Sequence, residues 1–291
     1  MSIIARYFNG TNVSDVSQPT GTFPAMSNLN VPFGQPGIYN LDGHNVDCTS
    51  PGLYRFKCPS RPYWINRFIG KSLNGTTDLY ALMSAISWNQ VYGSAHELSP
   101  DPVNMTDTQC QTISNSGHYG KWRFRCGYVV RFLLWLLPQY GVICRRVQFN
   151  TGEAFNGYSD GHVAIETYTS GRWVLWDMSN GLYFTNDYGE HLSTKAVMEM
   201  FRLRVPPGVV RMDATDKWSS DAPAYFDMSV WRDAEVLTPD ELIAWHKRVM
   251  QIPEISNVAW LPPGTESKAT WLASRGVQVV SEATFNAQFY P

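Results

Sequence analysis

Residues 161–177 of the chain have the sequence GHVAIETYTSGRWVLWD, and this stretch decides the fold. Two runs rich in β-branched and aromatic residues flank the dipeptide Ser170-Gly171, which is typical of a two-residue turn. The pattern predicts an antiparallel hairpin with strands 161–168 and 172–178. In the register that this turn favours, Asp177 faces Ala164 and lies diagonal to His162 on the same face of the sheet.

The register of this hairpin decides whether His162 and Asp177 can meet. A slip of two residues would place them directly opposite one another, whereas a slip of one would put them on opposite faces. The favoured register lets the carboxylate orient the imidazole, as in a triad of nucleophile, base and orienting group.

A second strong signal precedes the hairpin. From Cys126 to about Leu137, apolar residues recur at helical spacing and also fill the opposite side, which predicts a buried helix that Pro138 and Gly141 end. Residues 142–149 follow as a strand. The position of Cys126 at the helix start matters because the positive end of the helix dipole lowers the pKa of a thiol, and a nearby imidazolium lowers it further.

Four segments in this order resemble the core of the transglutaminase-like superfamily, a circularly rearranged relative of the papain-type cysteine proteases. The resemblance covers about residues 76–190, including a helix that ends in Ile86-Ser87-Trp88. The matching segments are Cys126, Gly141-Val142-Ile143-Cys144-Arg145-Arg146-Val147, Gly161-His162-Val163-Ala164-Ile165-Glu166 and Gly171-Arg172-Trp173-Val174-Leu175-Trp176-Asp177.

The resemblance implies roles for individual residues. Cys126 is expected to be the nucleophile, His162 the general base and acid, and Asp177 the group that orients the imidazole. Arg145 and Glu166 match family positions with a structural role. The family also uses an oxyanion-stabilising side chain upstream of the cysteine, in addition to the backbone N–H of the cysteine itself. The candidates for that side chain are Trp88, Gln90, Gln109 and Gln111.

The rest of the chain is predicted to surround this core, giving three regions at 1–70, 71–190 and 191–291. The first is expected to hold loops and short strands such as Leu53–Phe56, and the third an α/β extension. We predict an α+β fold with a papain-like core, in which the cysteine-bearing helix packs on an antiparallel sheet. The other predicted elements are a helix at 77–90, a long loop at 93–121, a helix at 238–250 that opens with a capping box, and a final helix, strand and helix.

Composition excludes several classes of protein. The 291 residues contain 23 basic and 25 acidic side chains, a net charge of −2, so no basic surface predicts a nucleic-acid partner. The longest apolar run, 132–137, is far shorter than the roughly 20 residues of a membrane helix. The N-terminus lacks the pattern of a secretory signal, which favours a cytoplasmic location. The chain has no phosphate-binding glycine loop, and neither a metal nor an organic cofactor is implied.

Several other residues have alternative interpretations. The segment 157–161 fits the G-x-S-x-G pattern of serine hydrolases, but a strand rather than a helix follows it, which disfavours Ser159 as a nucleophile. Cys48 and Cys58 are either a disulfide of an exported protein or two buried thiols, and their spacing disfavours zinc. His246 is expected on the surface of the C-terminal helix. Two further expectations are a loop position for His118 and a core-facing position for Cys144.

These inferences predict cysteine-dependent acyl transfer through a thioester, with hydrolysis of an amide or peptide bond as the favoured reaction. One alternative is an amide-forming acyltransferase that uses an amine acceptor in a biosynthetic pathway. A second is a catalytically silent binding module on the same fold. The expected partner is a peptide, an amide or an acyl thioester, with no nucleic acid and no membrane, and both the substrate and the oligomeric state stay open.

Overall fold

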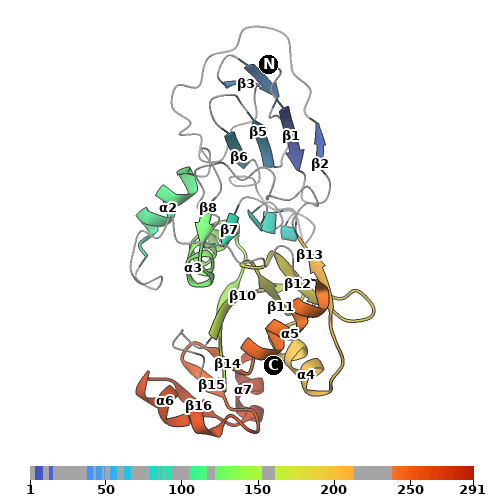
Figure 1. The fold of residues 1–291 in the computed structure, drawn as a ribbon. Coiled ribbons are helices and arrows are strands. Elements are labelled where there is room, and N and C mark those ends of the chain that lie inside the picture. The colour runs from blue at the N-terminus through green and yellow to red at the C-terminus, as the bar shows by residue number, and fades with distance from the viewer. Residues whose placement is uncertain are drawn as a thin grey trace. The chain divides into compact units, whose positions relative to one another are not determined.

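We describe the protein from a computed structural model (Figure 1). The chain divides into two compact units, Met1–Arg125 with Arg211–Trp231, and Cys126–Val210 with Arg232–Pro291. Each unit is considered by itself. The structure describes residues 4–8, 13–15, 38–41, 44–47, 49, 53–57, 62–66, 79–80, 82–83, 86–87, 90–92, 105–116, 122–152, 161–212 and 238–291.

In its described residues the first unit contains three small sheets, the helix α2 and further helical residues at 79–80, 82–83 and 86–87. A four-stranded sheet has the order β2-β1-β5-β6, β3 pairs with β4, and β7 pairs in parallel with β8. The predicted strand at Leu53–Phe56 is confirmed as part of β5. The elements are β1 (Ile4–Phe8), β2 (Val13–Asp15), β3 (Ile38–Leu41), β4 (His44–Asp47), β5 (Leu53–Lys57), β6 (Pro62–Asn66), β7 (Gln90–Tyr92), α2 (Asp107–Ser116) and β8 (Trp122–Phe124).

Two predictions for this unit need correction. The segment 93–121 is not all loop, because α2 lies within it. The helix starts after Thr106, whose backbone N–H donates to Oε1 of Gln109 at 2.7 Å while its hydroxyl accepts from the Gln109 N–H at 3.2 Å. This is a capping box, and the Thr-x-x-Gln pattern was visible in the sequence. The helix predicted at 77–90 ends earlier than expected, since strand β7 begins at Gln90; its apolar stripe is buried as predicted.

The second unit is built on an eight-stranded sheet with the order β13-β12-β11-β10-β9-β14-β15-β16. The pairs from β12 to β15 are antiparallel, and β15 pairs in parallel with β16. Its elements are α3 (Cys126–Leu136), η3 (Leu137–Tyr140), β9 (Cys144–Asn150), β10 (Gly161–Thr169), β11 (Arg172–Asp177), β12 (Leu182–Thr185), α4 (Thr194–Arg202), β13 (Gly208–Arg211), α5 (Pro239–Val249), β14 (Ile252–Ile255), β15 (Val258–Trp260), η6 (Glu266–Lys268), α6 (Ala269–Ser274), β16 (Gln278–Val280) and α7 (Glu282–Phe289).

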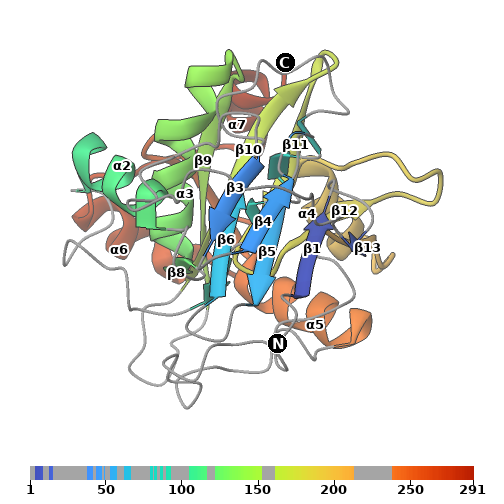
Figure 2. The same cartoon turned by 90° about the horizontal axis from the view of Figure 1, so that it is seen from above.

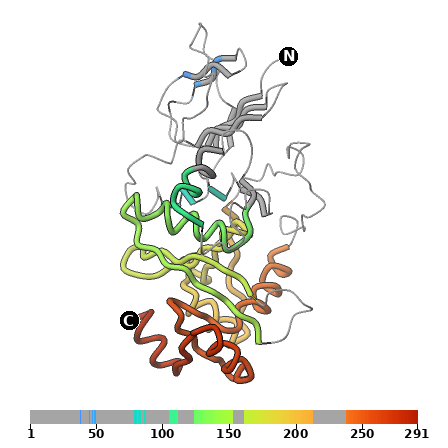
Figure 3. Tube along the Cα trace, turned by 90° about the vertical axis from the view of Figure 1, so that its left-hand side faces the viewer, coloured from blue at the N-terminus to red at the C-terminus, as the bar shows by residue number. Residues whose placement is uncertain are grey.

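These elements confirm that the protein is α+β with a mainly antiparallel sheet. The predicted helix at Cys126, the capping box of α5 and the final helix, strand and helix are all present. The sheet extends beyond the predicted hairpin, because β14 pairs with β9 although about a hundred residues separate them in sequence. The C-terminal segment therefore continues the same sheet; its trace is coloured orange to red in Figure 3.

The hairpin has the favoured register. Strands β10 and β11 pair Ile165 with Trp176 and Thr169 with Arg172, so the turn is Ser170-Gly171. Both turn residues have positive φ, 53° for Ser170 and 80° for Gly171, as a twisted two-residue hairpin requires. His162 and Asp177 consequently lie on the same face of the sheet.

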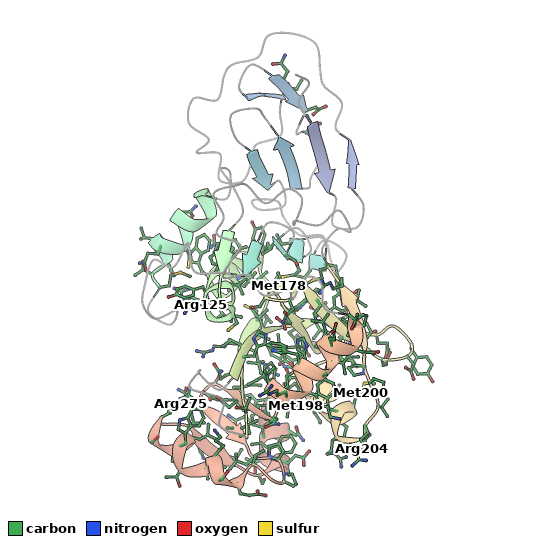
Figure 4. All side chains as sticks on the ribbon, viewed as in Figure 1. Arg125, Met178, Met198, Met200, Arg204 and Arg275 are labelled. Atoms are coloured by element: carbon green, nitrogen blue, oxygen red, sulfur yellow. The ribbon has the colours of Figure 1, made fainter. Side chains whose placement is uncertain are left out.

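The two faces of this sheet carry different helices. Val147, Phe149, Ala164 and Leu175 share one face, where they form a core with residues of α4, α5 and α7, including Met198, which is labelled in Figure 4. Helix α3 contacts β10 and β9 and lies on the other side of these strands from α4 and α5 (Figures 1 and 2). Helix α3 begins at Cys126 and strand β10 begins at Gly161. The two starts meet at one end of the sheet, where Cys126 interacts with His162 and Val163.

Gly161 fixes the start of β10 and offers a first test. A Cβ at this position would collide with the carbonyl oxygen of Phe149 on the neighbouring strand. We expect Gly161→Ala to push the adjacent His162 out of place, to lower the free energy of unfolding by roughly 1–3 kcal/mol, and to slow alkylation of Cys126. Urea unfolding and iodoacetamide labelling measure the two effects.

Gly189→Ala is the matched control for this test. A Cβ on Gly189 meets no atom within 4 Å. Its φ of +75° disfavours any side chain, so this variant tests backbone strain without a collision. Labelling of Cys126 should be normal in this variant. Normal labelling in Gly161→Ala as well would contradict the role assigned to the close approach.

Candidate active site

Cys126 is the first residue of α3, and its side chain is half-buried. Its thiol is hydrogen-bonded to the side chain of His162 and to the backbone N–H of Val163. Burial raises the pKa of the Cys126 thiol, but the interactions with His162 and the Val163 N–H outweigh it, and the pKa is lowered. The N-terminal end of the helix dipole acts in the same direction. The geometry favours a thiolate.

His162 is the second residue of β10 and is buried. Its Nε2 lies 3.0 Å from Oδ2 of Asp177, but the ring N–H is too poorly aligned on that oxygen for a good hydrogen bond. Because Nε2 faces Asp177, Nδ1 is the nitrogen left for Cys126. Burial lowers the pKa of His162, and the charges of Asp177 and Cys126 raise it to about 10. The thiol and imidazole therefore favour a thiolate–imidazolium pair.

Asp177 is the last residue of β11, and both of its oxygens are held. The backbone N–H groups of Ser179 and Asn180 donate to Oδ1 at 3.1 and 3.2 Å. The side-chain amide of Asn180 donates to Oδ2 at 2.7 Å. Burial raises the pKa of Asp177, but the neighbouring His162 and His246 hold it well below its usual range. The carboxylate is thus charged and fixed in orientation.

His246 is a fourth member of this cluster, which the sequence interpretation missed. It was predicted on the surface of α5, but it is buried, and its Nε2 lies 2.6 Å from Oδ2 of Asp177. Its Nδ1 lies 2.7 Å from the carbonyl oxygen of Leu242. Leu242, His246 and Val249 are spaced at i, i+4 and i+7, which places the histidine on the buried stripe of the helix. This spacing is the signal in the sequence that indicates its burial.

Trp245 covers the histidine pair from the side. Its ring meets that of His162 edge to face, with centroids 4.9 Å apart, and that of His246 at 4.7 Å. Such contacts between aromatic rings are favourable and leave little room for water. A dry surrounding strengthens the attraction between the charges of His162 and Asp177.

Arg145 and Glu166 form a second buried group that supports the hairpin. They face each other across β9 and β10, and Nε and Nη2 of Arg145 donate to one Glu166 oxygen at 2.8 and 2.7 Å. The same carboxylate accepts from the Thr194 N–H, at the start of α4, and from the Tyr290 hydroxyl. The guanidinium also donates to the carbonyl of Phe289. The pair ties the sheet to α4 and to the C-terminal residues.

The other sequence candidates belong to the first unit, are not part of this cluster, or fall outside the described residues. Trp88, Gln90, Gln109 and Gln111 all belong to the first unit, where Gln109 caps α2. Trp88, Cys48, Cys58, His118 and Ser159 lie outside the described residues. Cys144 is half-buried, and burial raises the pKa of its thiol to about 11. Cys126 therefore differs from Cys144 in the direction of its pKa shift.

No group of three or more His, Cys, Asp or Glu side chains within the described ranges is arranged to hold a metal ion. None of the helices in that part of the chain is long and apolar enough to cross a membrane. No family model matches the chain, and no curated protein or solved structure matches it significantly. The geometry of Cys126, His162, Asp177 and His246 is consequently the feature that bears on function.

Proposed function

We propose that the protein is a cysteine-dependent acyl-transfer enzyme with a papain-like, transglutaminase-like core. The observation that carries this proposal is the hydrogen bond between Cys126 and His162, with Asp177 placed behind the imidazole. A thiolate paired with an imidazolium is the nucleophile of thiol hydrolases. The half-burial of Cys126 is consistent with access for a substrate carbonyl.

The residues suggest a reaction in two steps. The Cys126 sulfur attacks the carbonyl carbon of an amide or thioester, a C–S bond forms, and the oxyanion is stabilised by the Cys126 N–H at the start of α3. His162 gives its proton to the leaving amine or thiol as the original C–N or C–S bond breaks. In the second step His162 takes a proton from water, the oxygen attacks the thioester, and the C–S bond to Cys126 breaks.

Hydrolysis is the reaction that we favour, and an amine that replaces water in the second step would make the protein an amide-forming transferase. The binding-module alternative is disfavoured because a buried thiolate–imidazolium–carboxylate arrangement is costly to keep without chemistry. No observation in the site selects the substrate.

A trapping experiment tests the proposal. The protein is mixed with an acyl thioester of N-acetylcysteamine or with an acyl p-nitroanilide, and intact-mass spectrometry follows the acyl group on Cys126. We expect an acyl-enzyme in the native protein and none in Cys126→Ala. Release as the free acid supports hydrolysis, and release as an amide only when an amine is added supports the transferase. Failure of a panel of acyl chains to load Cys126 would contradict the proposed function.

A further inference from the structure

Asp177 is shared by two histidines through the same oxygen. Oδ2 lies 2.6 Å from Nε2 of His246 and 3.0 Å from Nε2 of His162, and only the contact to His246 has the alignment of a hydrogen bond. The carboxylate cannot turn its other oxygen toward His162, because Oδ1 is occupied by two backbone N–H groups. His246 therefore shares the oxygen that orients His162, and its contact to that oxygen is the shorter and the better aligned of the two.

The surroundings of His246 define its charge. Both ring nitrogens face acceptors, the Leu242 carbonyl at Nδ1 and the Asp177 carboxylate at Nε2. A neutral imidazole has a single N–H, so both contacts are hydrogen bonds only if both nitrogens carry hydrogen. Oδ2 of Asp177 cannot readily be the donor, because it already accepts from Asn180. The two contacts are therefore both hydrogen bonds when each ring nitrogen of His246 carries a hydrogen.

The charges then alternate along the cluster, negative on Cys126, positive on His162, negative on Asp177 and positive on His246. The sum is zero, which reduces the cost of burying the group. Among the described residues, the other aromatic rings in contact with the His246 ring are Phe184 of β12 and Trp245 of α5, which do not carry charge. The titratable groups that face it are Asp177 of β11 and His162 of β10, whose ring centroid is 6.3 Å away.

We propose that His246 is a positioning residue that, through its positive charge and its hydrogen bond to Asp177, weakens the hold of Asp177 on His162 and makes the His162 proton easier to transfer. This inference rests on the proposed function. A positive charge favours proton loss from both neighbours, and it acts more strongly on the nearer one, His162. A general acid works best when it gives up its proton near the working pH.

The test follows Cys126 alkylation by iodoacetamide against pH, with peptide-resolved mass spectrometry, and needs no substrate. The profile of a thiolate–imidazolium pair has a lower transition for the thiol and an upper one for the imidazole. In His246→Phe we expect both transitions to move to higher pH. The upper transition should move further, by about one pH unit, which is a tenfold change in proton concentration. His246→Gln keeps a donor without the charge, and we expect at least half of that shift.

The control variant is His191→Gln, which replaces another buried histidine of the same unit. His191 bonds to the Leu175 carbonyl and packs on Trp176, so its replacement removes a buried histidine without removing the hydrogen bond between His246 and Asp177, and its profile should match the wild type. Nitrogen-detected NMR of the unmodified protein gives a readout independent of folding of the variants. We expect both His246 nitrogens to be protonated at neutral pH.

Each outcome decides the inference. A His246→Gln profile equal to wild type, with or without a shift in His246→Phe, overturns the role of the charge, as does a single protonated nitrogen on His246. Different observations would show that the proposed function itself is wrong. In that case His162→Ala would leave the Cys126 profile unchanged, or Cys126 would accept no acyl group, whatever the His246 variants do.

Discussion

Replacing His162 with alanine is expected to slow iodoacetamide labelling of Cys126 at neutral pH by about a hundredfold, because a thiol about two pKa units higher has about one hundredth of the thiolate. In the intact protein the interaction with His162 overcomes burial and lowers the pKa of Cys126. Without the imidazole, burial remains and raises the pKa of the thiol above its usual value. The thiolate would then be scarce at neutral pH.

The sign of the pH dependence follows from the same shifts. A lowered pKa keeps Cys126 ionised as the pH falls below that of an ordinary thiol, so its labelling should persist into mildly acidic solution. Cys144, whose pKa is raised to about 11, should label only in strongly alkaline solution and serves as the internal control. Equal pH profiles for Cys126 and Cys144 in the native protein, or an unchanged Cys126 rate in His162→Ala, would contradict the thiolate–imidazolium pair.

Replacing Glu166 with alanine is expected to cost about 3–5 kcal/mol in the free energy of unfolding, the effect of removing one partner from a buried ion pair. The carboxylate is fully buried and accepts from Arg145, the Thr194 N–H and the Tyr290 hydroxyl. Within the described residues, the change leaves the guanidinium of Arg145 with the Phe289 carbonyl and the faces of the surrounding aromatic rings. Three elements lose a common attachment point.

Chemical unfolding measures this loss, and Glu199→Ala is the matched control. Glu199 pairs with Arg202 on the exposed surface of α4, where an ion pair contributes little to stability. We expect a large decrease in the unfolding midpoint for Glu166→Ala and almost none for Glu199→Ala. Similar midpoints for the two variants would show that the buried pair does not hold the sheet to α4 and the C-terminal residues.

Local sequence patterns were sufficient to predict many of the helices and strands of the second unit. The Ser170-Gly171 turn favoured one register, which the structure has, and that register puts His162 and Asp177 on the same face, because side chains alternate strictly along a strand. The apolar residues after Cys126 predicted the buried helix, and Thr238-Pro239-Asp240-Glu241 predicted the start of α5. In each case the signal lies within a few residues of the element that it predicts.

The errors arose where short-range signals were overlooked or where the contact is distant in sequence. Helix α2 was missed although its capping box was present, since the many turn-forming residues around it suggested a loop. His246 was expected on the surface although its spacing with Leu242 and Val249 places it on the buried stripe of α5. Helical periodicity indicates that burial but does not identify the partner of a buried polar residue. That partner, Asp177, is 69 residues away.

The sequence by itself therefore determined the α+β class, the hairpin and its register, and the helix that begins at Cys126. Only the tertiary structure decided that His162 contacts the thiol, that β14 extends the sheet, and that α5 brings a second histidine to Asp177. The physical reason is that local backbone preferences act over a few residues. The pairing of buried charges depends instead on which distant segments fold against the same end of the sheet.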